Sequence, residues 1–176
     1  MAYITNNLTF IHVYKTGGTS IRSFLKHGRE IGDVHSSASF VKERIGEKKW
    51  KAVPSFAIIR NPHDFAVSLY KHLKRDEQHE FEYLAKGTFL EFLVELKKDF
   101  RKVKIAEEYF LDTQASRVEG VTNLYRFDQL EEAMREMAKI EDVKFRPYDL
   151  NKAEYNGEQY HTLETNEIIV ELYKDD

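Results

Sequence analysis

The chain has 176 residues, 41% hydrophobic and 32% charged, which favours a single globular domain over residues 1–176. Its 27 Lys and Arg against 30 Asp and Glu give a net charge of −3, so we expect no nucleic-acid partner. The lack of cysteine excludes a disulfide framework and cysteine-ligated metals. Apolar runs such as residues 56–59 are too short to span a membrane, and residues 1–7 do not read as a signal peptide. We therefore expect a cytoplasmic protein with no membrane span.

The beginning of the chain predicts a strand followed directly by a helix. Residues 8–13 are rich in apolar and β-branched side chains, which is typical of a strand. After two glycines, Ile21, Phe24 and Leu25 recur at helical spacing until Gly28 interrupts the pattern.

The remaining elements are predicted from the same periodicities and from helix caps. In chain order, we expect a helix from Ser36 or Ser37 to Gly46, a strand over residues 55–59, a helix capped by Asn61 with Pro62 in its first turn, an amphipathic helix over residues 81–100, a strand over residues 123–127, and helices over residues 128–140 and 164–174. The final helix should bury Ile168, Ile169 and Leu172. This alternation predicts an α/β sandwich with a mainly parallel sheet.

The segment between the first predicted strand and helix has the composition of an anion-binding loop. It consists of Lys15, Thr16, Gly17, Gly18, Thr19 and Ser20. Glycines let main-chain N–H groups turn toward an anion, the helix start adds a positive dipole end, and the lysine and hydroxyls add charge and donors. The alternative is an ordinary glycine turn with a Ser or Thr cap.

This loop differs from that of nucleotide triphosphatases. The Walker pattern places lysine after the glycines, whereas Lys15 precedes them. The next predicted core strand ends in Arg60, where such enzymes often carry an aspartate for Mg²⁺. A small-molecule kinase is therefore disfavoured, and we expect no metal site.

A second candidate motif follows the strand over residues 55–59. Arg60 comes directly before Asn61 and Pro62, and Ser68 lies farther along the predicted helix. If the two strands are parallel, Arg60 leaves the sheet at the same edge as Lys15. The alternative is that Arg60 forms a surface ion pair and Ser68 is an ordinary helical serine.

Together the two motifs resemble the sulfotransferases that use 3′-phosphoadenosine 5′-phosphosulfate (PAPS), in particular the heparan sulfate 2-O-sulfotransferase-like carbohydrate branch. Residues 15–20 are similar to the family's 5′-phosphosulfate loop, and Arg60 with Ser68 is similar to its 3′-phosphate motif. The likeness continues through residues 35–38, 125–130 and 150–152. Tyr14 and Phe65 depart from it, because the family often has proline and arginine there.

The resemblance implies a P-loop-like three-layer sandwich in one sulfotransferase-like domain. It implies metal-independent transfer of a sulfuryl group from PAPS to a hydroxyl, most simply of a carbohydrate. Lys15 would stabilise the leaving oxygen and His35 would act as general base, with Glu30 and Asp33 next in line. Residues 15–20, Arg60 and Ser68 would bind the cofactor.

Other readings stay open at this point. The chain is short for the family, so it could be a module that binds a nucleotide without catalysis. One such nucleotide is PAP (3′-phosphoadenosine 5′-phosphate), the product that remains when PAPS loses its sulfuryl group. A basic cluster of Lys71, Lys74 and Arg75 is either a solvated helix face or a contact for an anionic sugar. Arg126 and Lys152 are weaker cofactor candidates by resemblance alone.

Overall fold

The computed structural model describes residues 2–25, 27–32, 35–76, 79, 81–102, 104–105, 108–109, 112–145 and 158–176. The chain divides into two compact units. The first comprises Met1–Arg60 and Gln114–Lys152, and the second comprises Asn61–Thr113 and Ala153–Asp176. The single domain expected over residues 1–176 stays a prediction.

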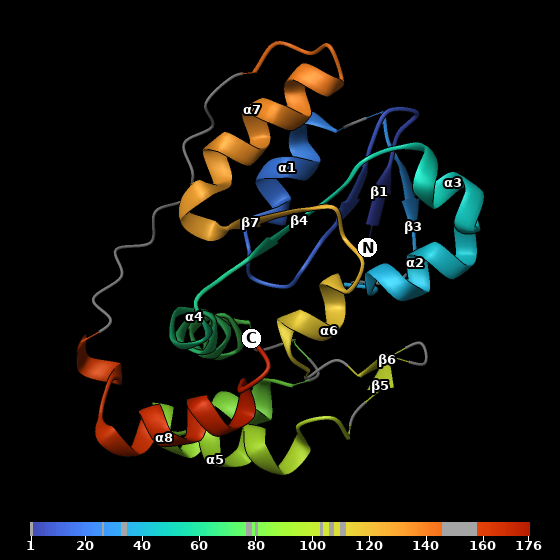
Figure 1. Ribbon diagram of the computed structural model, residues 1–176. Coiled ribbons are helices and arrows are strands. Elements are labelled where there is room, and N and C mark those ends of the chain that lie inside the picture. The colour runs from blue at the N-terminus through green and yellow to red at the C-terminus, as the bar shows by residue number, and fades with distance from the viewer. Residues whose placement is uncertain are drawn as a thin grey trace. The chain divides into compact units, whose positions relative to one another are not determined.

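A five-stranded mixed sheet lies at the centre of the first unit (Figure 1). In spatial order its strands are β3 (Arg29–Ile31), β1 (Ala2–Ile4), β2 (Thr9–Ile11), β4 (Ser55–Ile59) and β7 (Asn123–Arg126). β2 is parallel to β4 and β4 to β7, whereas β1 is antiparallel to both β2 and β3. The α/β class is confirmed, but the mainly parallel sheet is corrected to a mixed one. The reason is the tight turn after β1, where the Thr5 N–H donates to the Leu8 carbonyl and reverses the chain.

Helices cover both faces of this sheet (Figure 1). They are α1 (Gly18–Phe24), α2 (Ala38–Ile45), α3 (Glu47–Ala52), α6 (Gln114–Val118) and α7 (Leu130–Ile140), with the 3₁₀ turn η2 (Phe127–Gln129) before α7. Alternate strand residues point to opposite faces. Phe10 and Phe56 pack with residues of α1 and α7, whereas Ile11 and Ala57 pack with residues of α2 and α3. The first unit is therefore built in three layers.

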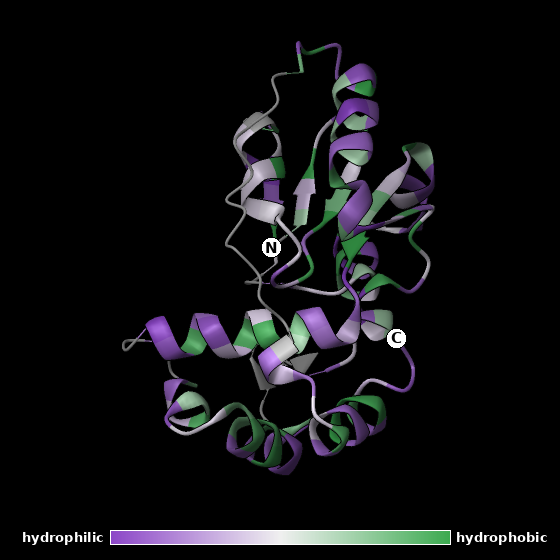
Figure 2. Ribbon diagram, turned by 90° about the vertical axis from the view of Figure 1, so that its left-hand side faces the viewer, coloured by the Kyte–Doolittle hydropathy of each residue, from purple (hydrophilic) through white to green (hydrophobic). Residues whose placement is uncertain are grey.

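The second unit is mainly helical. Its elements are α4 (Pro62–Arg75), η1 (Glu82–Ala85), α5 (Phe89–Asp99), the short strands β5 (Lys104–Ile105) and β6 (Glu108–Tyr109), η3 (Glu158–Tyr160) and α8 (Leu163–Leu172). Helix α8 packs against α4 and α5. Hydrophobic and hydrophilic segments alternate along the long helices (Figure 2), as expected when one face of each helix is buried. The aromatic rings of Tyr70, Phe89 and Phe92 meet in this core.

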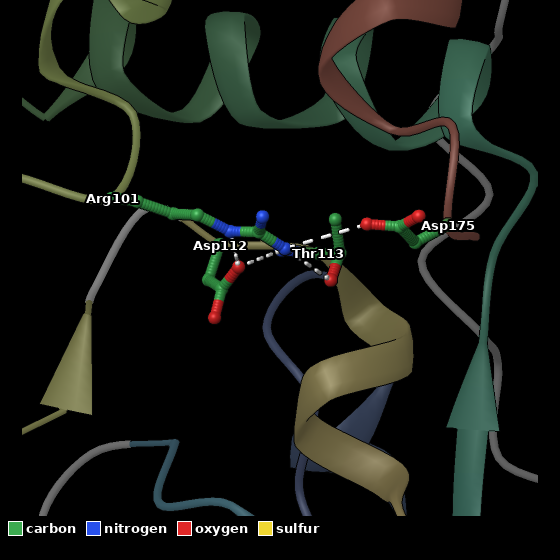
Figure 3. Close-up of polar contacts among 4 residues, drawn as sticks. All are labelled: Arg101, Asp112, Thr113 and Asp175. Atoms are coloured by element: carbon green, nitrogen blue, oxygen red, sulfur yellow. Dashed lines mark hydrogen bonds and ion pairs between the residues drawn. The ribbon is translucent and has the colours of Figure 1, made fainter.

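A polar network on the second unit joins the segments after α5, before α6 and after α8 (Figure 3). Arg101 Nε lies 2.6 Å from Asp112 Oδ1, and Arg101 Nη2 lies 3.6 Å from Asp175 Oδ2. Nη2 also donates to Thr113 Oγ1 at 3.4 Å. The nearby carboxylates raise the pKa of Arg101, so its charge is permanent.

Several predicted elements are confirmed to within a residue. These are β4, α2 with Ser37 as its cap, and α4, where Asn61 Oδ1 accepts the His63 N–H at 2.9 Å. The prediction of a single helix over residues 81–100 is wrong. Thr88 and Glu91 form a capping box that starts α5 separately from η1. Ile169 and Leu172 are buried as expected, but Ile168 is half-exposed. Within the described residues, no helix is both long and apolar enough to cross a membrane.

Candidate functional site

The loop between β2 and α1 is the first part of the candidate site. The chain leaves buried β2, and Lys15 then takes a left-handed conformation with φ of 56°. Gly17, at the cap of α1, is also left-handed with φ of 80°. Lys15 Nζ lies 5.8 Å from the centre of the Tyr14 ring, and its side chain is half-exposed. The loop thus holds a cation at the carboxyl end of a central strand.

The two glycines of the loop are also required by packing. A β-carbon at Gly17 would lie 2.8 Å from Leu130 Cδ2, and one at Gly18 would lie 1.9 Å from His12 Cδ2. Gly18 therefore makes room for the His12 ring beside the start of α1. This contact gives the glycines a structural role, whether or not the loop also binds an anion.

The hydroxyl groups of the loop differ in their surroundings. Thr16 is buried, and its Oγ1 donates to the Val13 carbonyl at 2.8 Å, so its hydroxyl proton is used within the loop. Thr19 is exposed and Ser20 is half-buried, and the Ser20 N–H donates to the Gly17 carbonyl at 2.9 Å. Of the hydroxyl groups expected to bind an anion, that of Thr16 therefore stabilises the loop itself, whereas that of Thr19 is exposed.

Arg60 stands at the end of β4, next to β2 in the sheet. Because β2 and β4 are parallel, Lys15 and Arg60 follow strand ends on the same edge, as the sequence predicted. The Arg60 guanidinium lies over the Phe127 ring, 4.6 Å from its centre. The same ring borders the loop, because a β-carbon at Gly17 would lie 3.2 Å from Phe127 Cε2. One aromatic side chain therefore connects the two predicted motifs.

The main chain of Arg60 is fixed by a side chain from α6. Gln114 Oε1 accepts the Arg60 N–H at 2.8 Å, and Gln114 Nε2 donates to the Arg60 carbonyl at 2.7 Å. Gln114 is only 2% exposed. The amide thus mimics a neighbouring strand at the point where β4 ends.

His35 lies beside the loop, in contact with residues that follow β2. It is 8% exposed, and its Nδ1 donates to the His12 carbonyl at 3.0 Å. Its ring meets those of His12 and Tyr14 edge-on, with centres 4.6 and 4.5 Å apart. The His35 backbone is left-handed, with φ of 69°, and its carbonyl accepts from Arg117 Nη1 at 2.7 Å. Because Nδ1 carries the proton, Nε2 is the ring atom able to accept one.

Desolvation lowers the pKa of both histidines. Desolvation lowers the pKa of His35 to about 2, with further lowering from His12 and Arg117. Desolvation also lowers the pKa of His12 to about 3, assisted by the charges of Arg22 and Lys15. Neutral His35 has a lone pair at every pH in the neutral range, but its basicity is low. We therefore expect His35 to cause no change of catalytic rate with pH in the neutral range.

The other predicted residues have different surroundings. Ser68 is a half-buried residue of α4 in the second unit, and its assignment to the 3′-phosphate stays a prediction. Glu30 is exposed and pairs with Arg22 at 3.0 Å, and Arg126 is exposed and pairs with Asp128 at 2.9 Å. Asp33 and Lys152 fall outside the described residues, as does the segment 150–152 that carried part of the resemblance.

The basic cluster on α4 makes local contacts in the second unit. Lys74 Nζ donates to the Tyr70 hydroxyl at 2.8 Å, and Lys71 Nζ lies 5.3 Å from the centre of the Tyr160 ring. Arg75 is exposed at the end of the helix. The cluster is thus partly a set of cation–aromatic pairs.

Two further pairs of histidines lie close together. The rings of His72 and His79 are 5.7 Å apart, and those of His63 and His161 are 5.6 Å apart. Among the described residues, no group of three or more His, Asp or Glu side chains could hold a metal ion.

Three residues of the site were not predicted as functional from the sequence. Gln114 and Arg117 contact main-chain groups far away in the chain, and Phe127 follows an edge strand. The only local signal is that Gln114 and Arg117 lie three apart, on one side of a helix.

No protein-family model, curated protein or solved structure matches the chain. The role of these residues is therefore inferred from their chemistry and their placement.

Proposed function

We propose that this chain is a PAPS-dependent sulfotransferase that transfers a sulfuryl group to a hydroxyl of an acceptor, most simply a carbohydrate. Residues 15–20 would hold the phosphosulfate and Arg60 the 3′-phosphate, and no metal would take part. The three-layer first unit, with parallel β2, β4 and β7, supports a P-loop-like sandwich as its framework. A cytoplasmic location is part of the same proposal.

The observation that supports this function best is the meeting of the two motifs at the Phe127 ring. The ring borders the loop at Gly17 on one side and carries the Arg60 guanidinium on another. Two cations, Lys15 and Arg60, thereby stand at neighbouring ends of parallel strands. A ligand with two separate anionic groups suits this arrangement better than one with a single phosphate.

The proposed transfer needs one bond to form and one to break. The acceptor oxygen attacks sulfur while the bond from sulfur to the bridging phosphate oxygen breaks, releasing PAP. Negative charge grows on that bridging oxygen, where Lys15 would stabilise it. The acceptor's proton would pass to Nε2 of His35, the ring nitrogen that the His12 carbonyl leaves unprotonated.

A second function is favoured by one observation. Burial lowers the pKa of His35 to about 2, which makes it a poor proton acceptor. A module that binds PAP or a related nucleotide without transferring sulfate would need no base. Binding and turnover must therefore be measured separately.

Ligand-dependent unfolding tests the binding step. We expect PAP to raise the melting temperature of the full chain without divalent metal. At a PAP concentration of 100 times its Kd, the free energy of unfolding should rise by about 2.7 kcal/mol. AMP should stabilise less, because it lacks the 3′-phosphate. Stabilisation by ATP with Mg²⁺ and none by PAP would contradict the proposal and favour the kinase reading.

Turnover with PAPS and a panel of sugars then separates the enzyme from the binding module. Transfer of labelled sulfate to any sugar supports the enzyme, and tight PAP binding without transfer supports the module. Arg60→Ala should weaken PAP more than AMP, by roughly 10-fold or more. Equal weakening of both ligands would show that Arg60 is structural.

A further inference from the structure

Helix α6 contacts the main chain at two of the residues to which we assign a function. Gln114, its first residue, makes two hydrogen bonds to the main chain of Arg60. Arg117, one turn later, donates to the His35 carbonyl. These two contacts come from neighbouring positions on one short helix, and both belong to the first unit.

Each contact acts where the chain needs support. Arg60 follows the last ladder residue of β4, since Ile59 pairs with Arg126 and the ladder then ends. The Gln114 amide continues the pairing by one residue, which fixes where the Arg60 side chain departs. His35 is left-handed, a conformation that non-glycine residues rarely adopt, and the Arg117 guanidinium holds its carbonyl in place.

The burial and charge of the two side chains suit such a role. Gln114 is buried, so its amide makes its hydrogen bonds shielded from water. Arg117 is half-buried, and its cation acts on a neutral carbonyl oxygen, which makes a charge-assisted bond of 2.7 Å. The His35 ring is oriented from its other side by the His12 carbonyl, so the residue is held at two points.

We infer that Gln114 and Arg117 are positioning residues of the proposed sulfotransferase, with Gln114 setting Arg60 for the 3′-phosphate and Arg117 setting His35 for the acceptor's proton. The inference rests on the proposed function. It assigns separate tasks to two residues of one helix, so their variants should fail in different ways.

Binding and turnover of the full-length variants test the inference. We expect Gln114→Ala to weaken PAP roughly 10-fold while changing AMP affinity less, as Arg60→Ala would. We expect Arg117→Ala to lower kcat roughly 10- to 100-fold with PAP affinity within about twofold. Arg117→Lys, which keeps a cationic donor, should recover part of the lost kcat.

Double variants distinguish positioning from general loss of structure. Arg117→Ala combined with His35→Ala should be about as slow as His35→Ala alone, because the first change acts only through the second residue. Gln114→Ala combined with Arg60→Ala should bind PAP about as weakly as Arg60→Ala alone. Arg135→Ala, which removes an exposed arginine paired with Glu131, serves as the matched control and should behave as wild type.

A spectroscopic measurement makes the inference independent of activity. Nitrogen-15 spectra of the histidine rings should show His35 protonated at Nδ1 in the wild type. In Arg117→Ala, the chemical shifts of the His35 ring nitrogens should differ from those of the wild type. If the wild type fails to bind PAP, the proposed function fails, and this signal still tests Arg117. An unchanged His35 signal in Arg117→Ala overturns the inference, and so does a parallel loss of PAP affinity, kcat and melting temperature in both variants.

Discussion

The two units use their polar side chains in different ways. In the first unit, Gln114 is buried and bonds to the main chain of Arg60, while the Thr16 hydroxyl bonds to the main chain of Val13. In the second, the Arg101 side chain is 45% exposed and pairs with the carboxylates of Asp112, which is 14% exposed, and Asp175, which is 52% exposed. Buried bonds to the main chain fix backbone geometry, whereas exposed ion pairs are screened by water and salt.

The cores of the two units differ correspondingly. The first unit contains the buried His35 and the half-buried His12, whose pKa values are lowered by desolvation, next to a loop with left-handed residues. The second is held by aromatic and aliphatic packing, with Phe92 at its centre in contact with Tyr70 and Phe89. We therefore expect a lowered pH and the replacement of loop glycines to destabilise the first unit most. Truncation of buried side chains should destabilise the second unit most.

Truncation of the second unit's core should give the largest effect. Phe92 is 0% exposed, so Phe92→Ala removes a whole buried ring, and we expect a loss of about 3–5 kcal/mol in the free energy of unfolding. Urea denaturation followed by circular dichroism measures this. Val94→Ala on the same helix is the control, because Val94 is 40% exposed and should change stability by about 0.5 kcal/mol or less. Equal losses in the two variants would mean that α5 is packed differently.

A methyl group at Gly18 should give the largest effect of a single substitution in the candidate loop at neutral pH. Gly18→Ala places a β-carbon 1.9 Å from the His12 ring, and overpacking of this kind costs about 1–3 kcal/mol. Chemical denaturation measures the loss. Adding His12→Ala should recover part of it, because the clash then disappears.

Gly46 provides a control for the glycine substitution itself. Its φ of 84° and ψ of 148° lie in a region that residues with a side chain rarely adopt, yet a β-carbon there would meet no atom within 4 Å. Gly46→Ala should therefore cost backbone strain alone, about 1–3 kcal/mol, and His12→Ala should recover none of it. A Gly18→Ala protein as stable as the wild type would show that His12 does not pack on α1.

Much of the fold was readable from local signals. β4 and α4 follow from a buried apolar run and from Asn61 with Pro62 at a helix start. The short elements β1, β3 and α6 were missed, because a few residues carry too little periodicity for a prediction. The mixed sheet could not be foreseen either, because strand direction depends on which segments pair in space.

The candidate site was predictable only in part. The loop at Lys15 and the position of Arg60 follow from strand ends and glycines. The contacts of Gln114 and Arg117 span 54 and 82 residues along the chain, so no local pattern reveals them. The neutral state of His35 depends on burial by side chains from other segments, which its own neighbours do not show.

Acidification should destabilise the first unit increasingly as the pH falls below about 6.5. The folded pKa values of His12 and His35 are about 3 and about 2, below the unfolded value near 6.5. Between those values the unfolded chain binds protons that the folded chain does not, so stability falls as pH falls below about 6.5. Each histidine should remove about 1.4 kcal/mol per pH unit there, measured by urea denaturation between pH 7 and pH 5.

The variant His35→Asn isolates one of the two histidines. Asparagine tolerates a left-handed backbone and does not titrate in this range, so the stability of this variant should depend less on pH. A wild-type stability that is constant from pH 7 to pH 5 would mean that His12 and His35 are open to water. The two units would then not differ in how their stability depends on pH.

Removal of the Arg101 side chain should give the smallest effect. Its contacts with Asp112 and Asp175 are ion pairs of a half-exposed side chain, so Arg101→Ala should cost about 1 kcal/mol or less. The loss should shrink further in 1 M salt, where charges are screened over about 3 Å. Asp112→Ala should cost more than Arg101→Ala, because Asp112 Oδ1 also accepts the Thr113 N–H at 2.8 Å and that bond remains useful without the arginine. A loss of 2 kcal/mol or more that salt does not change would mean that the contacts of Arg101 are shielded from water. The two units would then differ in the packing of their cores but not in the shielding of their polar contacts.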